Sequence, residues 1–121
     1  MPEASSDEAL MAMVADGDQR AFAQLVERHL PRAYAIARRV LSNQADAEDA
    51  AQEAFSKLWT HARDWQPARA SFSTWFYRIM VNASLDLARR HGARHELTDS
   101  DNLLAELLTP QPELQSAYGQ A

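Results

Sequence analysis

Apolar side chains recur every three or four residues through most of this chain, and this spacing constrains the fold more than any other feature. In the segment 47–63 one face carries the set Ala47, Ala50, Ala51, Ala54, Phe55, Leu58, Trp59 and Ala62. The opposite face is polar, as in an amphipathic helix that buries one side. The sequence therefore predicts a helix here. Strands are disfavoured throughout, because the chain has only three glycines and five prolines and is rich in good helix formers.

Two further helices are expected towards the N-terminus. Segment 7–15 begins with Asp7, an acid suited to cap a short helix, and Asp18 is suited to cap a long helix over 19–41. Pro31 lies inside the long segment. Because the apolar pattern continues in phase beyond this proline, we expect a kink rather than a break.

The second half of the chain predicts one more long helix. Residues 42–46 are read as a turn, and residues 64–70 as a loop that contains a proline. Either Ser71 or Ser73 caps the helix that follows, which runs to about residue 91. The predicted fold is all-α: a small bundle of three main helices with a short helix before them.

Length and composition are those of one globular domain. The chain has 121 residues, of which 46% are hydrophobic and 24% charged. No apolar run reaches the roughly 20 residues that a membrane-spanning helix needs, and no leader pattern opens the sequence. The chain has no cysteine, which excludes disulfides and thiolate metal sites and is compatible with the cytoplasm, where we expect the protein.

Charge is segregated along the chain. The net charge is −5, but residues 65–95 carry five arginines and one acid, a balance of +4. Residues 1–64 have a balance of −4, and residues 96–121 one of −5. A basic segment between two acidic ones favours a local anion-binding surface.

An enzyme is not indicated by the residues that could carry chemistry. The histidines are His29, His61, His91 and His95, and the clustered acids are Asp46, Glu48, Asp49 and Glu53. Gly92 separates the last two histidines, which favours an exposed helix end over a metal pair. No Glu-x-x-His pair accompanies the acids, and no glycine-rich phosphate loop or nucleophile elbow occurs. We expect neither catalysis nor a metal or cofactor.

Aromatic residues are concentrated beside the basic segment. Seven of the ten fall between Phe55 and Tyr77. Four of them lie on apolar stripes and are expected in the core: Phe55, Phe72, Trp75 and Phe76. Trp65 falls in the expected loop, where it is either a lid on the core or an exposed platform. Rings next to arginines suit single-stranded nucleic acid, whose bases stack on aromatics while cations follow the phosphates.

One face of the last helix is polar. Arg78, Asn82 and Asp86 follow one another at intervals of one turn, opposite the apolar stripe that contains Phe76. Two readings remain open for this face. It is either an ordinary solvated surface or a surface whose amide reads the edges of nucleic-acid bases.

Two of these segments carry a family likeness. "DAEDAAQEAFSKLW" followed by "FSTWFYRIMVNASLDLARR" closely resembles region 2 of bacterial sigma factors of the extracytoplasmic-function (ECF) group, and "GDQRAFAQLVERH" at 17–29 resembles the start of that domain. The likeness extends over about residues 7–94. It implies a domain that binds core RNA polymerase and recognises and melts the promoter −10 element.

The resemblance assigns a role to each face. The acidic face of the third helix would dock on the clamp coiled coil of the largest polymerase subunit, through Glu48, Asp49, Gln52 and Glu53. Trp65 would wall a pocket for an extruded base, with Lys57 and His61 at its rim and Ile79, Asn82 and Ala83 at its floor. Phosphates would be met by Arg69, Arg78, Arg89 and Arg90, and Asp86 lies on the same strand-binding face.

Three features depart from the family pattern. The loop is one residue longer than in some relatives, and Trp65 stands where Phe is commoner. In addition, family members continue after a linker into a second domain that reads the −35 element; we expect either an N-terminal domain excised from a longer protein, which we favour, or a protein that naturally lacks the second domain. We therefore expect a region 2 domain over 1–95, and over 96–121 an acidic linker whose leucines at 103–108 have no assigned partner.

Two functions are compatible with the sequence. The first is the promoter-binding polymerase subunit, with an anti-sigma factor as a further partner. The alternative is a sigma-like decoy that binds an anti-sigma factor without touching DNA.

Overall fold

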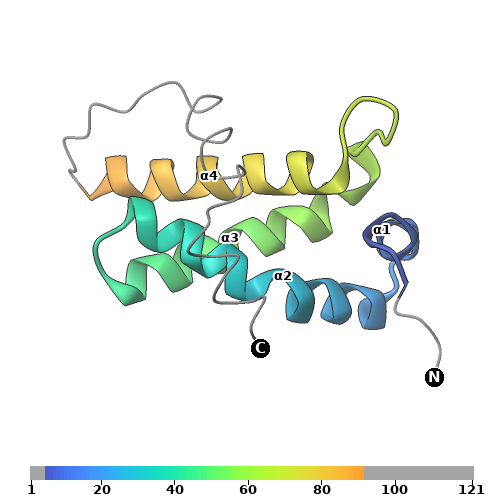
Figure 1. Ribbon diagram of the computed structural model, residues 1–121, viewed down its shortest axis with the longest axis horizontal. Coiled ribbons are helices and arrows are strands. Elements are labelled where there is room, and N and C mark those ends of the chain that lie inside the picture. The colour runs from blue at the N-terminus through green and yellow to red at the C-terminus, as the bar shows by residue number, and fades with distance from the viewer. Residues whose placement is uncertain (1–4, 92–121) are drawn as a thin grey trace, which may run out of the picture.

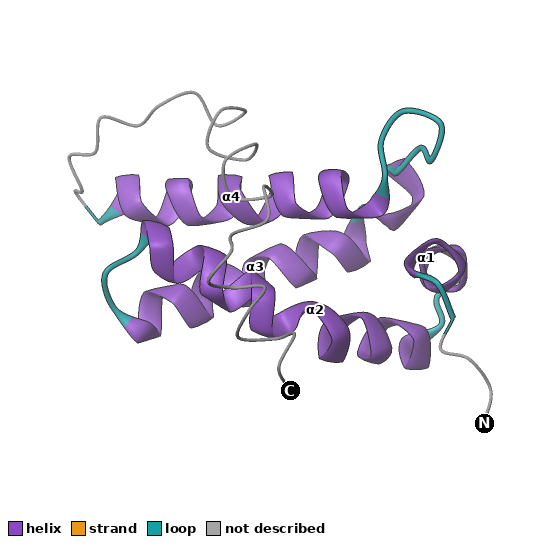
Figure 2. Ribbon diagram, in the orientation of Figure 1, coloured by secondary structure: helices purple, strands orange, loops and turns teal. Residues whose placement is uncertain are grey.

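The computed structural model describes residues 5–91, and the regular elements in this part of the chain are all helical (Figures 1 and 2). The order is α1 (Asp7–Ala15), α2 (Gln19–Val40), α3 (Gln44–Thr60), the short 3-10 helix η1 (Ala62–Asp64) and α4 (Phe72–Arg90). This confirms the predicted all-α bundle of three long helices and one short N-terminal helix. The expected linker over 96–121, with its leucines, lies outside the described residues.

Side-chain caps define where the helices begin. Asp18 accepts hydrogen bonds from the backbone N–H groups of the first turn of α2, as expected. Ser71, not Ser73, caps α4. The predicted cap of α1 needs correction, although its predicted bounds, 7–15, are confirmed: the Ser6 hydroxyl accepts from the Ala9 N–H, and Asp7 is the first helical residue.

The predicted bounds of α3 also need correction. The helix starts at Gln44 because the Asn43 side chain accepts from the backbone N–H of Asp46, so the expected turn over 42–46 already contains the first helical turn. At the other end α3 stops at Thr60. Of the remaining expected helical residues, His61 caps α3, and Ala62 and Arg63 belong to η1, a tighter 3-10 turn.

The turn between α1 and α2 depends on Gly17. Its φ is +91°, in the region that is open to glycine and strained for other residues. Its backbone N–H donates to the Val14 carbonyl at 2.8 Å, which ends α1 and redirects the chain into α2. Helix α2 then continues through Pro31 as one helix, and its two halves run in different directions in Figure 1.

Alanines allow the three long helices to pack closely. Helix α4 lies across α3 and α2, and α1 lies across the N-terminal end of α2 and contacts η1 (Figure 1). The buried alanines of α3 are Ala47, Ala50, Ala51 and Ala54. Trp59 was expected on the same stripe, but 37% of its surface is exposed and its ring edge packs on Phe22 of α2.

An aromatic cluster fills the centre of the bundle. Phe55 and Phe76 have ring centroids 4.8 Å apart, and Phe72 stacks on Phe76 at 5.7 Å. These three are buried, as predicted. Trp75, also expected in the core, is only half-buried, whereas Tyr77 is buried completely. The buried face of α4 is therefore wider than the predicted stripe.

Within residues 5–91 no helix has the length and apolar character that crossing a membrane requires.

Candidate nucleic-acid and protein interfaces

The outward face of α4 presents a row of polar side chains. Arg78, Asn82, Asp86 and Arg89 are all exposed. The guanidinium of Arg89 lies 3.5 Å from the Asp86 carboxylate, at a separation of three residues on one helix. Both groups are more than half exposed, so this ion pair is weak and can exchange with a ligand. The polar side chains predicted on this face of α4 are therefore exposed to solvent.

Trp65 combines the two alternatives that its sequence position left open. Its indole N–H donates to the Ala70 carbonyl at 2.9 Å, which folds the loop back on itself. Its ring meets Phe72 edge-on at 6.4 Å and Trp75 at 6.5 Å, yet the residue is only half-buried. The indole is thus held in place by the core and keeps an accessible portion.

A hollow adjoins this indole on the side of α1. It has a volume of about 410 Å³, and its wall contains Trp65 and Pro67 together with residues of α1 and η1, among them Met11, Ala15 and Arg63. Arg63 is fixed there by a hydrogen bond to the Ala15 carbonyl at 3.1 Å. Sequence reasoning placed no residue of α1 next to Trp65, because nothing in the spacing shows that α1 folds back onto the η1 turn.

Trp65 and Asn82 lie along one path. The indole contacts Phe72 and Trp75 in the first turn of α4, and Asn82 follows Trp75 by seven residues, about 10 Å along the helix axis. A strand that touches both must therefore run along α4. The single pocket expected from the sequence, with Trp65 as wall and Asn82 as floor, stays a prediction.

The other predicted pocket residues differ in accessibility. Ile79 is half-buried, whereas Ala83 is buried completely and presents no surface in this structure. His61 is exposed at the end of α3, and its Nδ1 lies 3.1 Å from the Asp64 carboxylate. Arg69 is exposed in the loop after Trp65.

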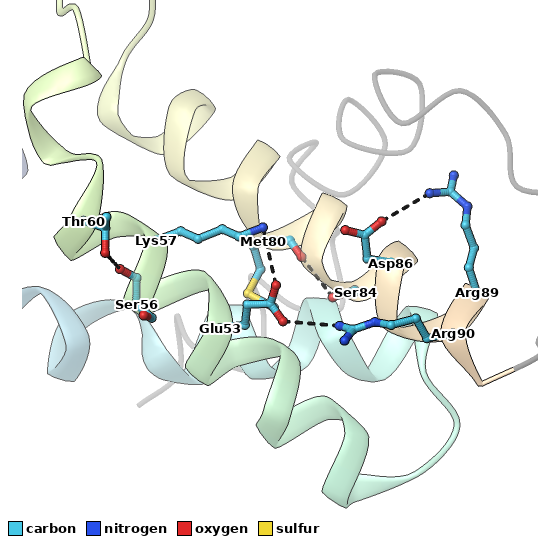
Figure 3. A network of polar contacts seen from close by, with 9 residues as sticks. All are labelled: Glu53, Ser56, Lys57, Thr60, Met80, Ser84, Asp86, Arg89 and Arg90. Atoms are coloured by element: carbon cyan, nitrogen blue, oxygen red, sulfur yellow. Dashed lines mark hydrogen bonds and ion pairs between the residues drawn. The ribbon is translucent and has the colours of Figure 1, made fainter.

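Lys57 and Arg90 converge on Glu53. The ammonium of Lys57 and the guanidinium of Arg90 each lie 3.4 Å from an oxygen of that carboxylate, and Figure 3 shows them reaching it from α3 and α4. Glu53 is therefore on the α4-facing edge of α3. The nearby hydroxyls of Ser84 and Thr60 donate to carbonyls within their own helices.

The remaining members of the predicted polymerase-docking set point elsewhere. Asp49 is exposed, while Glu48 and Gln52 line a groove between α2 and α3. Glu48 also accepts a hydrogen bond from the Gln44 side chain at 3.1 Å. The four residues thus wrap around α3 from the groove to the α4 edge, and do not form one flat patch.

The groove between α2 and α3 is largely apolar. Its volume is about 860 Å³, and its apolar wall is formed by Phe22, Val26, Leu30, Pro31, Tyr34, Ala51 and Phe55. Leu30 is 43% exposed. This surface was not predicted from the sequence, although Leu30 and Tyr34 are large apolar residues one helical turn apart and could have indicated it.

A buried polar chain ties α1, α2 and α4 together. His29 lies with Nδ1 2.8 Å from the Tyr77 hydroxyl and Nε2 3.0 Å from the Asp7 carboxylate. Because Asp7 can only accept, Nε2 carries the donated proton and Nδ1 accepts from Tyr77. Burial raises the pKa of Tyr77 far above its ordinary value, an effect that Arg32, 4.9 Å from the ring centre, partly offsets. This cluster therefore stabilises the fold by linking three helices.

Within the described residues no group of three or more histidines and acids is arranged to hold a metal ion.

Comparisons with known proteins identify the family and the fold. The family model for sigma-70 region 2 matches residues 25–94. The ECF RNA polymerase sigma factor SigE of Mycolicibacterium smegmatis is 38% identical over 89% of this chain and 44% of its own length. For the ECF RNA polymerase sigma-E factor of Escherichia coli, identity is 35% over 88% of this chain and 54% of the relative. The chain thus spans about half the length of these relatives.

Two solved structures have the same fold. An engineered region 2 of sigmaE, determined by NMR in complex with GTAAAA, superposes with a TM-score of 0.69 at 35% identity, covering 80% of this chain and 100% of that one. CnrH in complex with the cytosolic domain of CnrY gives a TM-score of 0.64 at 29% identity, covering 95% and 84%. This chain therefore belongs to the sigma-70 region 2 family, as a region 2 domain of the extracytoplasmic-function group.

Proposed function

We propose that this chain binds core RNA polymerase and holds the unpaired non-template strand of a promoter −10 element along α4. The observation that carries the proposal is the path from Trp65 past Asn82 to Arg89: a fixed, half-exposed indole followed by an exposed amide and cations on one helix face. Single-stranded nucleic acid needs stacking platforms and phosphate-binding cations. The engineered sigmaE region 2 was solved with GTAAAA, and 80% of this chain matches the whole of that domain.

The groove and acidic residues of α3 support docking on polymerase. An amphipathic helix laid into an apolar groove is a recurrent mode of protein recognition. Here Glu48 and Gln52 sit on the rim and Asp49 is exposed beside them, so a basic helix of the polymerase clamp would find both apolar contact and charge complementarity. The role is that of a non-enzymatic subunit, which would act with polymerase in the cytoplasm.

Strand binding is tested by fluorescence anisotropy of labelled oligonucleotides, with GTAAAA as the first probe and a scrambled hexamer beside it. Trp65→Ala should weaken binding by about 1–3 kcal/mol, because one stacking platform is lost. Trp59→Ala removes an indole that packs on Phe22 of α2 and should leave strand affinity unchanged. Affinity should fall with salt, with a slope of roughly 0.7 per phosphate contacted. Equal losses in the two variants would contradict the assigned path.

Polymerase docking is tested separately with purified core enzyme. Asp49→Arg should abolish binding to core, since it places a cation where a basic partner approaches, and should leave oligonucleotide affinity intact. Asp16→Arg makes the same charge change in the α1–α2 turn and serves as the control. Undiminished core binding by Asp49→Arg would refute the docking surface.

The alternative of a decoy remains testable in the same assays. CnrH, a relative of known structure, was solved bound to a protein partner, the cytosolic domain of CnrY. We expect an anti-sigma factor as a partner of this chain too. A decoy would bind that factor but show no affinity for any single strand, even at low salt.

A further inference from the structure

Glu53 links two surfaces that the proposed function separates. Its carboxylate lies 3.4 Å from the ammonium of Lys57, one turn further along α3, and 3.4 Å from the guanidinium of Arg90 on α4 (Figure 3). Lys57 and Arg90 are cations assigned to the promoter strand, whereas Glu53 belongs to the set assigned to polymerase. The Glu53 carboxylate is therefore ion-paired with two cations that nucleic acid would otherwise contact.

A carboxylate and a phosphate compete for the same donors. Both present anionic oxygens to ammonium and guanidinium groups at similar distances. A strand that contacts Lys57 and Arg90 must therefore displace Glu53 or leave its own phosphates less well neutralised. The competition is real at this site because the cluster is accessible: the side chains are 41% exposed for Lys57, 38% for Glu53 and 61% for Arg90.

Exposure also makes the pairs exchangeable. Ion pairs between partly exposed side chains are weak, so the carboxylate restrains its partners without locking them. Asp86 stands in the same relation to Arg89, at 3.5 Å. Glu53, however, contacts two strand-assigned cations at once, and it does so across the α3–α4 boundary.

We propose that Glu53 is a positioning residue that masks Lys57 and Arg90 in the free protein and thereby limits the affinity for nucleic-acid backbone. This inference rests on the proposed strand binding. Arg90 belongs to the phosphate-binding set, and the inference adds that the Lys57 ammonium, at the rim of the expected base pocket, also meets phosphate. Unmasking these two cations therefore raises the affinity for every single strand by the same factor and leaves the preference for one sequence unchanged.

The experiment compares Glu53→Gln with the unmodified chain by oligonucleotide anisotropy over a range of salt concentrations. Both GTAAAA and its scrambled form should bind about two- to tenfold more tightly to the variant, as expected for releasing two weak ion pairs. The salt dependence should steepen by up to about 0.7 in slope, the value for one further phosphate. Circular dichroism checks that the helical content is unchanged.

Two variants separate pairing from a general change of charge. Glu27→Gln removes an exposed acid of α2 and should change affinity far less. Glu53→Asp keeps the charge but shortens the side chain, so it withdraws the carboxylate from its two partners. It should bind strands more tightly than the unmodified chain, whereas long-range repulsion alone predicts no gain.

A double-mutant cycle gives the decisive result. In a chain that carries Lys57→Gln and Arg90→Gln, adding Glu53→Gln should have no further effect, because nothing remains to unmask. A gain of the same size in both backgrounds would overturn the inference, as would equal gains from Glu27→Gln and Glu53→Gln. Failure of the unmodified chain to bind any strand at low salt would instead refute the proposed function itself, and the inference with it.

Discussion

The two faces of α4 make different kinds of contact. On the inward face the Tyr77 hydroxyl is hydrogen-bonded to His29 at 2.8 Å, and Phe76 is enclosed by other rings. On the outward face the contacts of Arg89 and Arg90 are ion pairs of 3.4–3.5 Å between side chains that are more than one-third exposed. Buried contacts of the first kind fix a geometry, while exposed contacts of the second kind can be exchanged for a ligand.

This difference explains how one helix serves both packing and recognition. The inward face holds the axis of α4 against α2 and α3, and this fixes the spacing of the outward residues along the helix. Trp65 shares features of both faces, because buried contacts hold it and part of its ring is exposed. Phe72 and the Ala70 carbonyl hold its indole, and part of the ring remains accessible to a base.

The largest effect is expected from breaking the inward face. Phe76→Ala should lower the free energy of unfolding by about 3–5 kcal/mol, because it empties the centre of the aromatic cluster. Asn82→Ala, on the outward face of the same helix, should change it by less than about 0.5 kcal/mol. Urea unfolding followed by circular dichroism measures both. Similar losses would show that the two faces do not differ as described.

A smaller effect is expected from removing one buried hydrogen bond. Tyr77→Phe keeps the ring but leaves His29 Nδ1 without its donor, at a cost of about 1–3 kcal/mol. The pKa of Tyr77 is raised in the folded state, so its contribution is complete below the ordinary value of 10.0 and is lost as pH rises above it. Tyr77→Phe should therefore show a shallower alkaline loss of stability than the unmodified chain. Identical alkaline profiles would contradict a buried, partnered hydroxyl.

The local part of this arrangement could be predicted from the sequence. Helical periodicity found the helices, and the exposed positions of Arg78, Asn82 and Asp86 followed from their spacing on α4. The errors at the helix starts came from short-range side-chain contacts: Asn43 caps α3, so this helix starts at Gln44 and not at residue 47, and the cap of α1 is Ser6 and not Asp7. Periodicity reports which face is buried, but side-chain caps decide where a helix begins.

The long-range part could not be predicted, because it depends on which helix faces which. The sequence places His29 within the long N-terminal helix, but its pairing with Tyr77, 48 residues away, requires the packed bundle. The same holds for Glu53 and Arg90, separated by 37 residues. Family resemblance assigned these two residues to different partners, and only the structure brings them into contact.

The smallest effect on stability is expected at the C-terminal end of α4, where an exposed contact links this helix to α3. His91 Nδ1 lies 2.9 Å from the Asp46 carboxylate in the first turn of α3. This hydrogen bond, with a further one from Asn43, lowers the pKa of Asp46 below 3.8. A lowered pKa stabilises the fold at pH values above 3.8, and this contribution disappears as the pH falls through the folded-state value.

Asp46→Asn should therefore lose a small amount of stability at neutral pH and show a flatter stability profile on acidification below 3.8. Glu27→Gln, which removes an exposed acid in the middle of α2, is the matched control and should follow the unmodified profile. Urea unfolding at a series of pH values measures both. If Asp46→Asn and the unmodified chain lose stability in parallel on acidification, the contact between α3 and the end of α4 does not persist in solution. The outward face would then be held by the buried contacts of α4 alone.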